Sequence, residues 1–439
     1  MKTGQRFDVF IAFLSSARFV TVLTTATIGT AALTFAITQT IGWAGLFGIL
    51  GTLLALWATI LIGKRGEIEW SGLLPVSLLV FLGWTAATVF WSNYQWATLG
   101  SLAYLFAFSV LAVSVALLRD TIQIVRAFGD VLRVTLLVSI IMEVFSGLLI
   151  DMPIHFLSIT GELDRFGPIQ GIVGSRNQLG MIAIVALVTF ATELRTRSVR
   201  RGTSVGSISL AAVCLLLSQS PVAIGATAVV GTASLALWAL RRVKAERRRF
   251  WQFGLLGTSL ITLILAWVFR SQIIGILDAT KDLAYRLNLW RRIMGLISAH
   301  TIEGWGWIGA WRGELVPFVG FQQFPGGAPD SAANAFFDVA LQLGLAGLVA
   351  FLILVALAFV RSWLLAVAKR SVVFAWPALV LLAMITTSLA ESSILVSFGW
   401  LTLVVCTVKA SRELSWRQAF ATVPGRPDLP HEGAAPGNR

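Results

Sequence analysis

Long apolar runs recur along most of this chain and are separated by short polar segments. An apolar run of about 20 residues crosses the hydrocarbon core of a bilayer as a helix, because a helix satisfies its own backbone groups. The runs are continuous rather than alternating, which argues against membrane-spanning strands. With 57% hydrophobic and 13% charged residues, the composition also excludes an ordinary soluble globule. The sequence therefore predicts an all-α polytopic membrane protein.

We expect about twelve transmembrane helices, each roughly 20 residues long. The expected spans are 20–39, 42–62, 72–90, 98–118, 131–150, 177–194, 205–219, 222–240, 250–270, 334–360, 373–390 and 394–409. They would form a single transmembrane domain over residues 1–409. Residues 410–439 are rich in Pro and Gly and predict a flexible cytoplasmic tail.

The basic residues are distributed unevenly over the polar segments. With the N-terminus placed in the cytoplasm, 26 of the 34 Lys and Arg residues fall in cytoplasmic segments. The positive-inside rule therefore predicts a multi-pass protein of the plasma membrane with both termini in the cytoplasm. Topology and anionic lipid account for most of the net charge of +13, so we expect no nucleic-acid partner.

Two long polar segments fall on the predicted outer side, residues 151–176 and residues 271–333. Loops longer than about 15 residues are usually functional or disordered, and the tryptophans of the second segment argue against disorder. Within it, residues 282–299 predict a helix that lies at the membrane surface or on the bundle. Its expected apolar stripe consists of Leu283, Leu287, Trp290, Met294 and Ile297.

Eight cations remain on the outer side, and seven of them are arginines. They are Arg165, Arg176, Arg270, Lys281, Arg286, Arg291, Arg292 and Arg312. Guanidinium groups bind phosphate oxygens through paired hydrogen bonds, so the cluster favours an anion-binding site. Arg176 is the most suggestive, since it opens a predicted helix whose free amides add partial positive charge. Alternatively, each arginine pairs with a nearby acid, namely Glu162, Asp164, Asp278, Asp282, Glu303 or Glu314, or extends along the membrane interface.

Several short motifs in this part of the chain resemble those of the O-antigen ligase and polymerase superfamily. They are RLNLW at 286–290, SAHTIEGWG at 298–306, SAANAFFD at 331–338, LGLAGL at 343–348, GSRNQLG at 174–180, SQS at 218–220, and Glu391. The motifs occur in the family's order and cover roughly residues 165–400. The large predicted outer loop before the tenth span also agrees with the family.

The resemblance implies a bacterial GT-C-type glycosyltransferase of the cell envelope, involved in polysaccharide biosynthesis. Such enzymes take a glycan from undecaprenyl pyrophosphate at the outer face of the inner membrane and transfer it to an acceptor hydroxyl on a glycan, lipid or protein. No metal, nucleotide or other cofactor is implied, because the lipid pyrophosphate is already an activated leaving group. By resemblance, Arg286 is the best candidate to neutralise the pyrophosphate, and Arg176 is the second. The other expected substrate-binding residues are Arg165, Arg291, Arg292, Asn334 and Glu391.

The chain departs from the family pattern at Ala333, where the family has a histidine taken to be the catalytic base or the group that positions the pyrophosphate. General-base catalysis contributes roughly 10²–10⁴-fold, so this difference would impair catalysis. Three interpretations stay open: an engineered inactivating change, a natural enzyme that uses another group such as Asp330 or His300, or a protein that binds lipid-linked glycan without transferring it. Pro221 also replaces an arginine of the family motif.

Other functions compete with the glycosyltransferase. Twelve spans are also typical of a secondary transporter, although the chain shows neither repeated halves nor helices broken at the midplane. A flippase or a binding protein for lipid-linked glycan is a further alternative. Ligase and polymerase share one architecture, so the sequence does not identify the acceptor. An assay of glycan transfer would separate these classes.

Overall fold

The computed structural model describes residues 16–66, 74–243, 280–325 and 327–413, together with isolated positions between 247 and 275. In these residues the regular structure consists of α-helices joined by short 3₁₀ and π turns, apart from one isolated β-bridge. The all-α prediction is therefore confirmed for this part of the chain. The ninth predicted span, at 250–270, and the tail beyond residue 413 lie largely or wholly outside the described residues.

Twelve α-helices are present in the described residues. They are α2 (Ala17–Ala32), α3 (Thr34–Gly63), α4 (Val76–Ala87), α5 (Gln95–Leu118), α6 (Thr121–Val144), α7 (Arg176–Thr196), α8 (Arg201–Leu217), α9 (Pro221–Arg242), α12 (Thr280–Ile297), α13 (Ala335–Ala368), α14 (Ala375–Ser388) and α15 (Ser397–Glu413). Six of them are long and apolar enough to cross a membrane, namely α3, α5, α6 with its following turn, α7, α9 and α13. Multiple membrane helices are thus a property of the structure, while the count of twelve spans and the single-domain boundary stay predictions.

The expected boundary between the first two spans corresponds to a break inside a helix. Gly42 has φ +73° and interrupts α3, between the predicted spans 20–39 and 42–62. Glycine adopts this left-handed conformation at little steric cost, so it lets the chain change direction without a loop. A one-residue turn at Leu33 separates α2 from α3.

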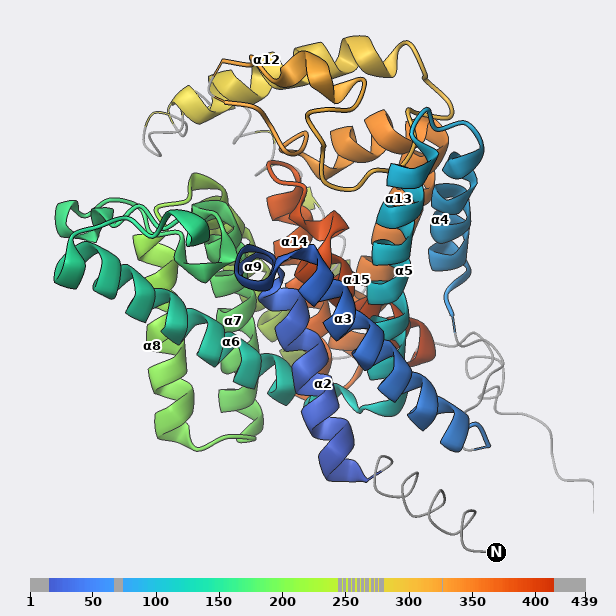
Figure 1. The fold of residues 1–439 in the computed structure, drawn as a ribbon. Helices are drawn as coiled ribbons and strands as arrows, with labels where there is room; N and C mark the ends of the chain where they lie inside the picture. The colour runs from blue at the N-terminus through green and yellow to red at the C-terminus, as the bar shows by residue number, and fades with distance from the viewer. Residues whose placement is uncertain are drawn as a thin grey trace, which may run out of the picture.

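Successive helices run in alternating directions, so the bundle has two ends. At one end α12 lies across the top of the bundle (Figure 1) and contacts the first turn of α7 through an ion pair from Arg176. At the opposite end, Arg412 donates a hydrogen bond to the carbonyl of Leu117 at 3.1 Å, and Arg119 donates to Thr21 at 2.7 Å. The starts of α2 and the ends of α5 and α15 therefore lie together. We call these two regions the α12 end and the opposite end.

Buried indole rings fix how the helices sit against one another. Trp57 donates to Thr27, Trp376 donates to Thr189 and Trp400 donates to Ser109, at 2.8–2.9 Å, each between two helices. A buried indole N–H needs an acceptor, and in an apolar bundle a hydroxyl on a neighbouring helix supplies it. Each pair therefore couples the rotation of one helix to that of its neighbour.

Two of the sequence motifs meet at a break in α13. Gly344 has φ +66° and interrupts the helix, which frees backbone groups on both sides of the break. The amides of Leu345 and Ala346 donate to the carbonyls of residues 301 and 302, while the carbonyls of residues 341 and 342 accept from the amides of Trp305 and Gly306. Gly304 and Gly344 touch here, because a Cβ on Gly344 would lie 2.1 Å from the carbonyl oxygen of Ile302 and a Cβ on Gly304 would lie 2.4 Å from the nitrogen of Gly344. This interlock holds the outer segment on the bundle.

The helix expected at 282–299 is confirmed as α12, but its predicted apolar stripe is wrong in part. Leu289 and Ile293 are buried against a small cluster of aromatic residues, whereas Leu287 and Met294 are 47% and 52% exposed. Periodicity identified a helix, yet several apolar faces were compatible with it. Residues 305–324 decide which face of α12 is buried, since Trp311, Phe318 and Phe321 pack with Leu289 and Ile293 in that cluster.

Candidate functional site

A ring of three polar contacts joins α7, α12 and the segment after α14. Arg176 contacts Asp282 at 2.6 Å, and Arg286 contacts Glu391 at 2.9 Å. Asp282 and Arg286 are four residues apart on α12, so they share one helix face. The amide of Asn177 donates to the same Oε1 atom of Glu391 at 2.5 Å. The structure therefore brings together Arg176, Arg286 and Glu391, three residues that lie more than 100 positions apart in sequence.

Arg286 has donor capacity that its protein partners do not use. Its side chain is 12% exposed, and its buried Nε has no hydrogen-bond partner among the described residues. A guanidinium presents five donors in a planar fork, and an unpaired buried donor is costly. An oxyanion placed beside Arg286 would use this donor, so the arrangement suits an anionic ligand.

The first turn of α7 is fixed by its own cap and by α9. Ser175 caps the helix by accepting from the amide of Gln178, and Ser220, the cap of α9, donates to Asn177 Oδ1 at 2.6 Å. A Cβ on Gly180 would lie 2.5 Å from the Cβ of Ala223, so glycine lets the two helices approach closely. The motifs at 174–180 and 218–220 are thus one structural unit that aims Asn177 at Glu391. Pro221 occupies the first turn of α9, where proline is favourable.

Ala333 lies beside this ring in a fixed backbone conformation. Its φ is +46°, in the left-handed region. On one side, Ala332 donates to Asp338 at 3.1 Å and accepts from the indole of Trp290 at 2.9 Å. On the other side, Asn334 caps α13 and donates to the carbonyl of Leu389 at 2.8 Å, two residues before Glu391. Among residues with a side chain, histidine is enriched in this region of φ, so the backbone at 333 suits the family's histidine better than alanine.

A buried polar network supports the segment that holds Ala333. Asp338 accepts from the indole of Trp311 at 2.7 Å and from the amide of Gln342 at 2.9 Å. The carbonyl oxygen of Gln342 accepts from the backbone amides of Ile308 and Gly309. Because these buried donors and acceptors all find partners, the network fixes residues 308–311 relative to α13.

The electrostatics of the ring centre on Glu391. Burial raises the pKa of the Glu391 carboxyl, Arg286 opposes that rise, and the negative charge of Asp330 adds to it. Burial also raises the pKa of Tyr285, and Asp330 contributes again. The carboxylates of Asp282 and Glu391 are the groups that Arg176 and Arg286 contact in this structure.

The other expected site residues have different surroundings. Arg165 is 83% exposed and contacts Asp164, while Arg291 and Arg292 are exposed on α12. The guanidinium of Arg292 lies 5.4 Å from the ring centre of Phe321. His300 contacts Glu303 at 3.0 Å and packs edge-on against Trp305. The structure shows no contact between these residues and the ring, among the residues that it describes.

Sequence reasoning missed three members or neighbours of the site. In the sequence, Asn177 and Ser220 are only members of family-like motifs, and Asp282 is only one of several acids able to pair with an arginine. Their shared signal was position, because Asn177 and Ser220 both lie at helix starts on the predicted outer side. Glu143, in α6, has a structural role. Its carboxylate accepts hydrogen bonds from the amides of Gln170 and Gly171 at 2.7 Å and holds the segment before α7.

The fold and the site define a class: a polytopic helical membrane protein with an arginine and carboxylate cluster beneath a surface helix. The family model "O-Antigen ligase" matches residues 206–352 of this chain, so the predicted resemblance to that family is confirmed over these residues. The matched range contains the motif at 218–220, Arg286, the interlock at Gly304 and Gly344, and Asn334. Arg176 and Glu391 lie outside that range, and the ring joins them to it. Comparison with curated proteins finds no match.

Proposed function

We propose that this protein transfers a glycan from a lipid pyrophosphate, of the undecaprenyl pyrophosphate type, to an acceptor hydroxyl at the α12 end of the bundle, and that this end faces outward. The observation that carries the proposal is the convergence of the family motifs on the Arg286–Glu391 pair. The family is one of membrane glycan ligases and polymerases, and polymerase is the alternative within the same class. A secondary transporter is less well supported, because the family match is to glycan ligases.

The proposed chemistry is a single displacement at the anomeric carbon. The acceptor oxygen forms a bond to that carbon, and the bond from the carbon to the pyrophosphate oxygen breaks with its electron pair. Arg286 and Arg176 stabilise the negative charge that develops on the leaving pyrophosphate, which is the largest expected contribution to the rate. The acceptor hydroxyl loses its proton to a base. Asp330 is a better candidate for this role than His300, because it lies three residues before Ala333, whereas His300 pairs with Glu303.

The direct test is transfer by the purified full chain in detergent or vesicles. A lipid-pyrophosphate-linked glycan is supplied with candidate acceptors, and product is followed by mass spectrometry. Release of lipid pyrophosphate together with extension of the acceptor supports the enzyme. Binding of the donor without turnover would support the binding protein instead, and ion-driven uptake of glycan without a new glycosidic bond would contradict the proposal.

Ala333→His is expected to raise transfer by roughly 10²–10⁴-fold, the usual contribution of a positioned general base. The left-handed backbone at 333 accepts a histidine readily. The matched control is Ala328→His, which adds the same side chain at an exposed position of the same segment. Equal rates for Ala333→His and the parent chain would show that position 333 has no catalytic role here.

Asp330→Asn is expected to lower transfer by about 10²-fold in the parent chain. The amide keeps the shape of the carboxylate but cannot accept the proton. In the Ala333→His background the same change is expected to cost much less, since histidine would then take the proton. A loss of equal size in both backgrounds would indicate that Asp330 has a structural role and is not the base.

Donor binding is expected to strengthen as the pH falls through the pKa of Glu391, which burial raises above its usual range. Protonation neutralises Glu391, which frees Arg286 for the ligand, while the pyrophosphate diester keeps its charge. The same protonation also raises the free energy of unfolding of the ligand-free protein, because a raised pKa means that the folded state binds the proton more tightly than the unfolded state. Donor affinity measured against pH in the parent and in Glu391→Gln checks this, and an unchanged pH dependence in the variant would refute the assignment.

A further inference from the structure

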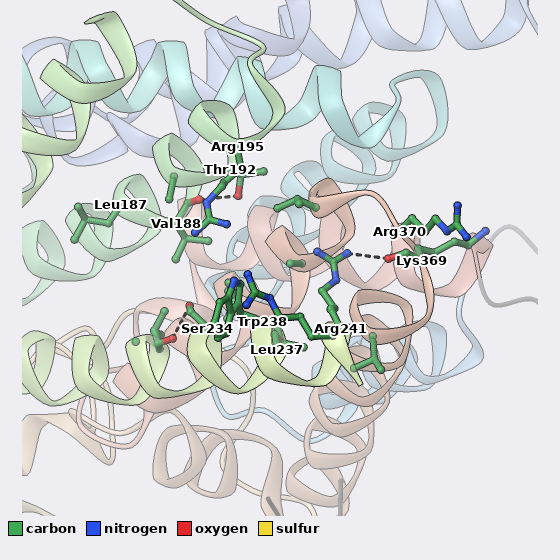
Figure 2. Close-up of a pocket in the computed structure, with 18 of the residues that line it drawn as sticks. Leu187, Val188, Thr192, Arg195, Ser234, Leu237, Trp238, Arg241, Lys369 and Arg370 are labelled. Atoms are coloured by element: carbon green, nitrogen blue, oxygen red, sulfur yellow. Dashed lines mark hydrogen bonds between the residues drawn. The ribbon is translucent and has the colours of Figure 1, made fainter. Parts of the chain in front are cut away.

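A cavity of about 540 Å³ lies at the opposite end of the bundle, far along the same helices that carry the ring. Its volume falls within the range of about 300–1,000 Å³ that is usual for ligand sites. The walls come from α7, α9 and the connection between α13 and α14. Figure 2 shows Leu187 and Val188 of α7 and Leu237 and Trp238 of α9 around it. Most of the wall is apolar, and the glycan chemistry proposed at the other end makes no use of it.

The residues that line this cavity include five cations and no acid, within the part of the chain that the structure describes. The cations are Arg195, Arg241, Arg242, Lys369 and Arg370. They come from the last turns of α7 and α9 and from the end of α13, so they border the cavity from different sides, with Arg195 on one side and Lys369 and Arg370 on another (Figure 2). Like charges gathered in this way repel one another unless an anion lies between them. The cluster therefore has the charge of an anion site placed at one end of an apolar cavity.

Arg241 fixes the wall of the cavity, and the other four cations border it. Arg241 donates to the backbone carbonyls of Ala366, Lys369 and Ser371 at 2.7–2.9 Å, and Figure 2 shows its side chain reaching the turn at Lys369. Arg242 lies 3.7 Å from the ring centre of Trp238. Arg195, Lys369 and Arg370 are exposed side chains. The turn that carries Lys369 and Arg370 is thus held against α9 by Arg241.

We propose that this cavity binds one anionic glycerophospholipid. Its phosphate lies between Arg195 and Arg242, and an acyl chain runs along the apolar wall toward the middle of the bundle. Basic pockets between membrane helices bind anionic headgroups, with about 1 kcal/mol from each Lys or Arg near the surface. That value corresponds to about fivefold in affinity for each cation. The charge asymmetry of the chain predicts that this end faces the cytoplasm, so the lipid comes from the cytoplasmic leaflet.

The proposed lipid lies on the same helices that position the ring. The other end of α7 carries Arg176 and Asn177, and the other end of α9 begins after Ser220. A lipid between the far ends of these helices would fix their spacing. The site is separate from the glycan chemistry, so its test needs no transfer assay.

Native mass spectrometry of the full chain tests the proposal, with phosphatidylglycerol or phosphatidylcholine added in detergent. We expect one phosphatidylglycerol to be retained in preference to phosphatidylcholine. Arg195→Gln combined with Arg242→Gln is expected to lower its retention by about 25-fold, at about fivefold for each cation. Arg200→Gln combined with Arg201→Gln is the matched control, because these exposed cations lie at the same end outside the cavity. We expect no change in lipid retention in that control.

Gly231→Phe separates a lipid from a free phosphate. Gly231 lines the cavity, and a Cβ added there meets nothing within 4 Å. A phenyl ring at this position is expected to occupy the acyl-chain space and abolish lipid retention without changing any charge. Retention of lipid by this variant, or equal retention of the two lipids by the parent chain, would overturn the proposal. If the charge variants alone lose binding and inorganic phosphate competes fully, the site binds a free anion and the lipid assignment is wrong.

Discussion

Replacing Arg286 with lysine is expected to lower glycan transfer by about 10²–10³-fold, the usual cost of losing one charge-stabilising donor. Lysine keeps the charge but loses the planar fork, so it cannot contact Glu391 and the pyrophosphate together. Initial rates at saturating donor measure the effect. Lys281→Gln, an exposed cation on the same helix, is the matched control and is expected to change the rate less than about threefold.

Arg286 also contributes to stability, so its catalytic role needs separate evidence. Arg286→Gln leaves Glu391 partly buried without its cation, and breaking a buried pair costs about 3–5 kcal/mol. The double variant Arg286→Gln with Glu391→Gln removes both charges and is expected to recover most of that stability. If the double variant also recovers transfer, the pair has only a structural role and the proposed pyrophosphate contact is wrong.

Replacing Gly344 with alanine is expected to destabilise the protein by about 3 kcal/mol or more. The added Cβ would lie 2.1 Å from the carbonyl oxygen of Ile302, and alanine also resists φ +66°. Either the break in α13 or the docked segment 301–306 must move, and the backbone hydrogen bonds between them are lost. Thermal unfolding in detergent, together with limited proteolysis of the segment near Trp305, measures both consequences.

Gly295→Ala is the control for the Gly344 variant. Gly295 lies within α12, and a Cβ there meets nothing within 4 Å. In a helix alanine is favoured over glycine by about 1 kcal/mol, so this variant is expected to be as stable as the parent or more stable. A Gly344→Ala protein that unfolds at the same temperature as the parent would show that the interlock contributes little.

Much of the site could be predicted from the sequence, because its charged members are unusual for their surroundings. Arginines on the predicted outer side of an apolar chain indicated an anion site, and in the structure Arg176 of α7 contacts the same face of α12 that carries Arg286. The sequence did not indicate that Arg165 lies away from that face. Sequence reports which residues fall on one side of a membrane, but not which of them share a helix face after packing.

The buried face of α12 shows the same limit for the fold. Its apolar residues are spread widely enough that Leu287 and Leu289 both suit a helix with one buried side. The aromatic cluster of Trp311, Phe318 and Phe321 selects Leu289 and Ile293. No periodicity within α12 carries that information, because it resides in a segment some 20 to 30 residues further along the chain.

The sequence by itself determined that this chain forms membrane helices, where many of them begin and end, and that residues 206–352 resemble the O-antigen ligase family. Hydropathy, glycine and helix caps act locally, and local effects are readable in a string of residues. Only the tertiary structure decided that Asn177, Glu391 and Arg286 meet, and that a cation-bordered cavity forms at the far ends of α7 and α9. These contacts depend on the rotation and spacing of packed helices, which are properties of the whole bundle.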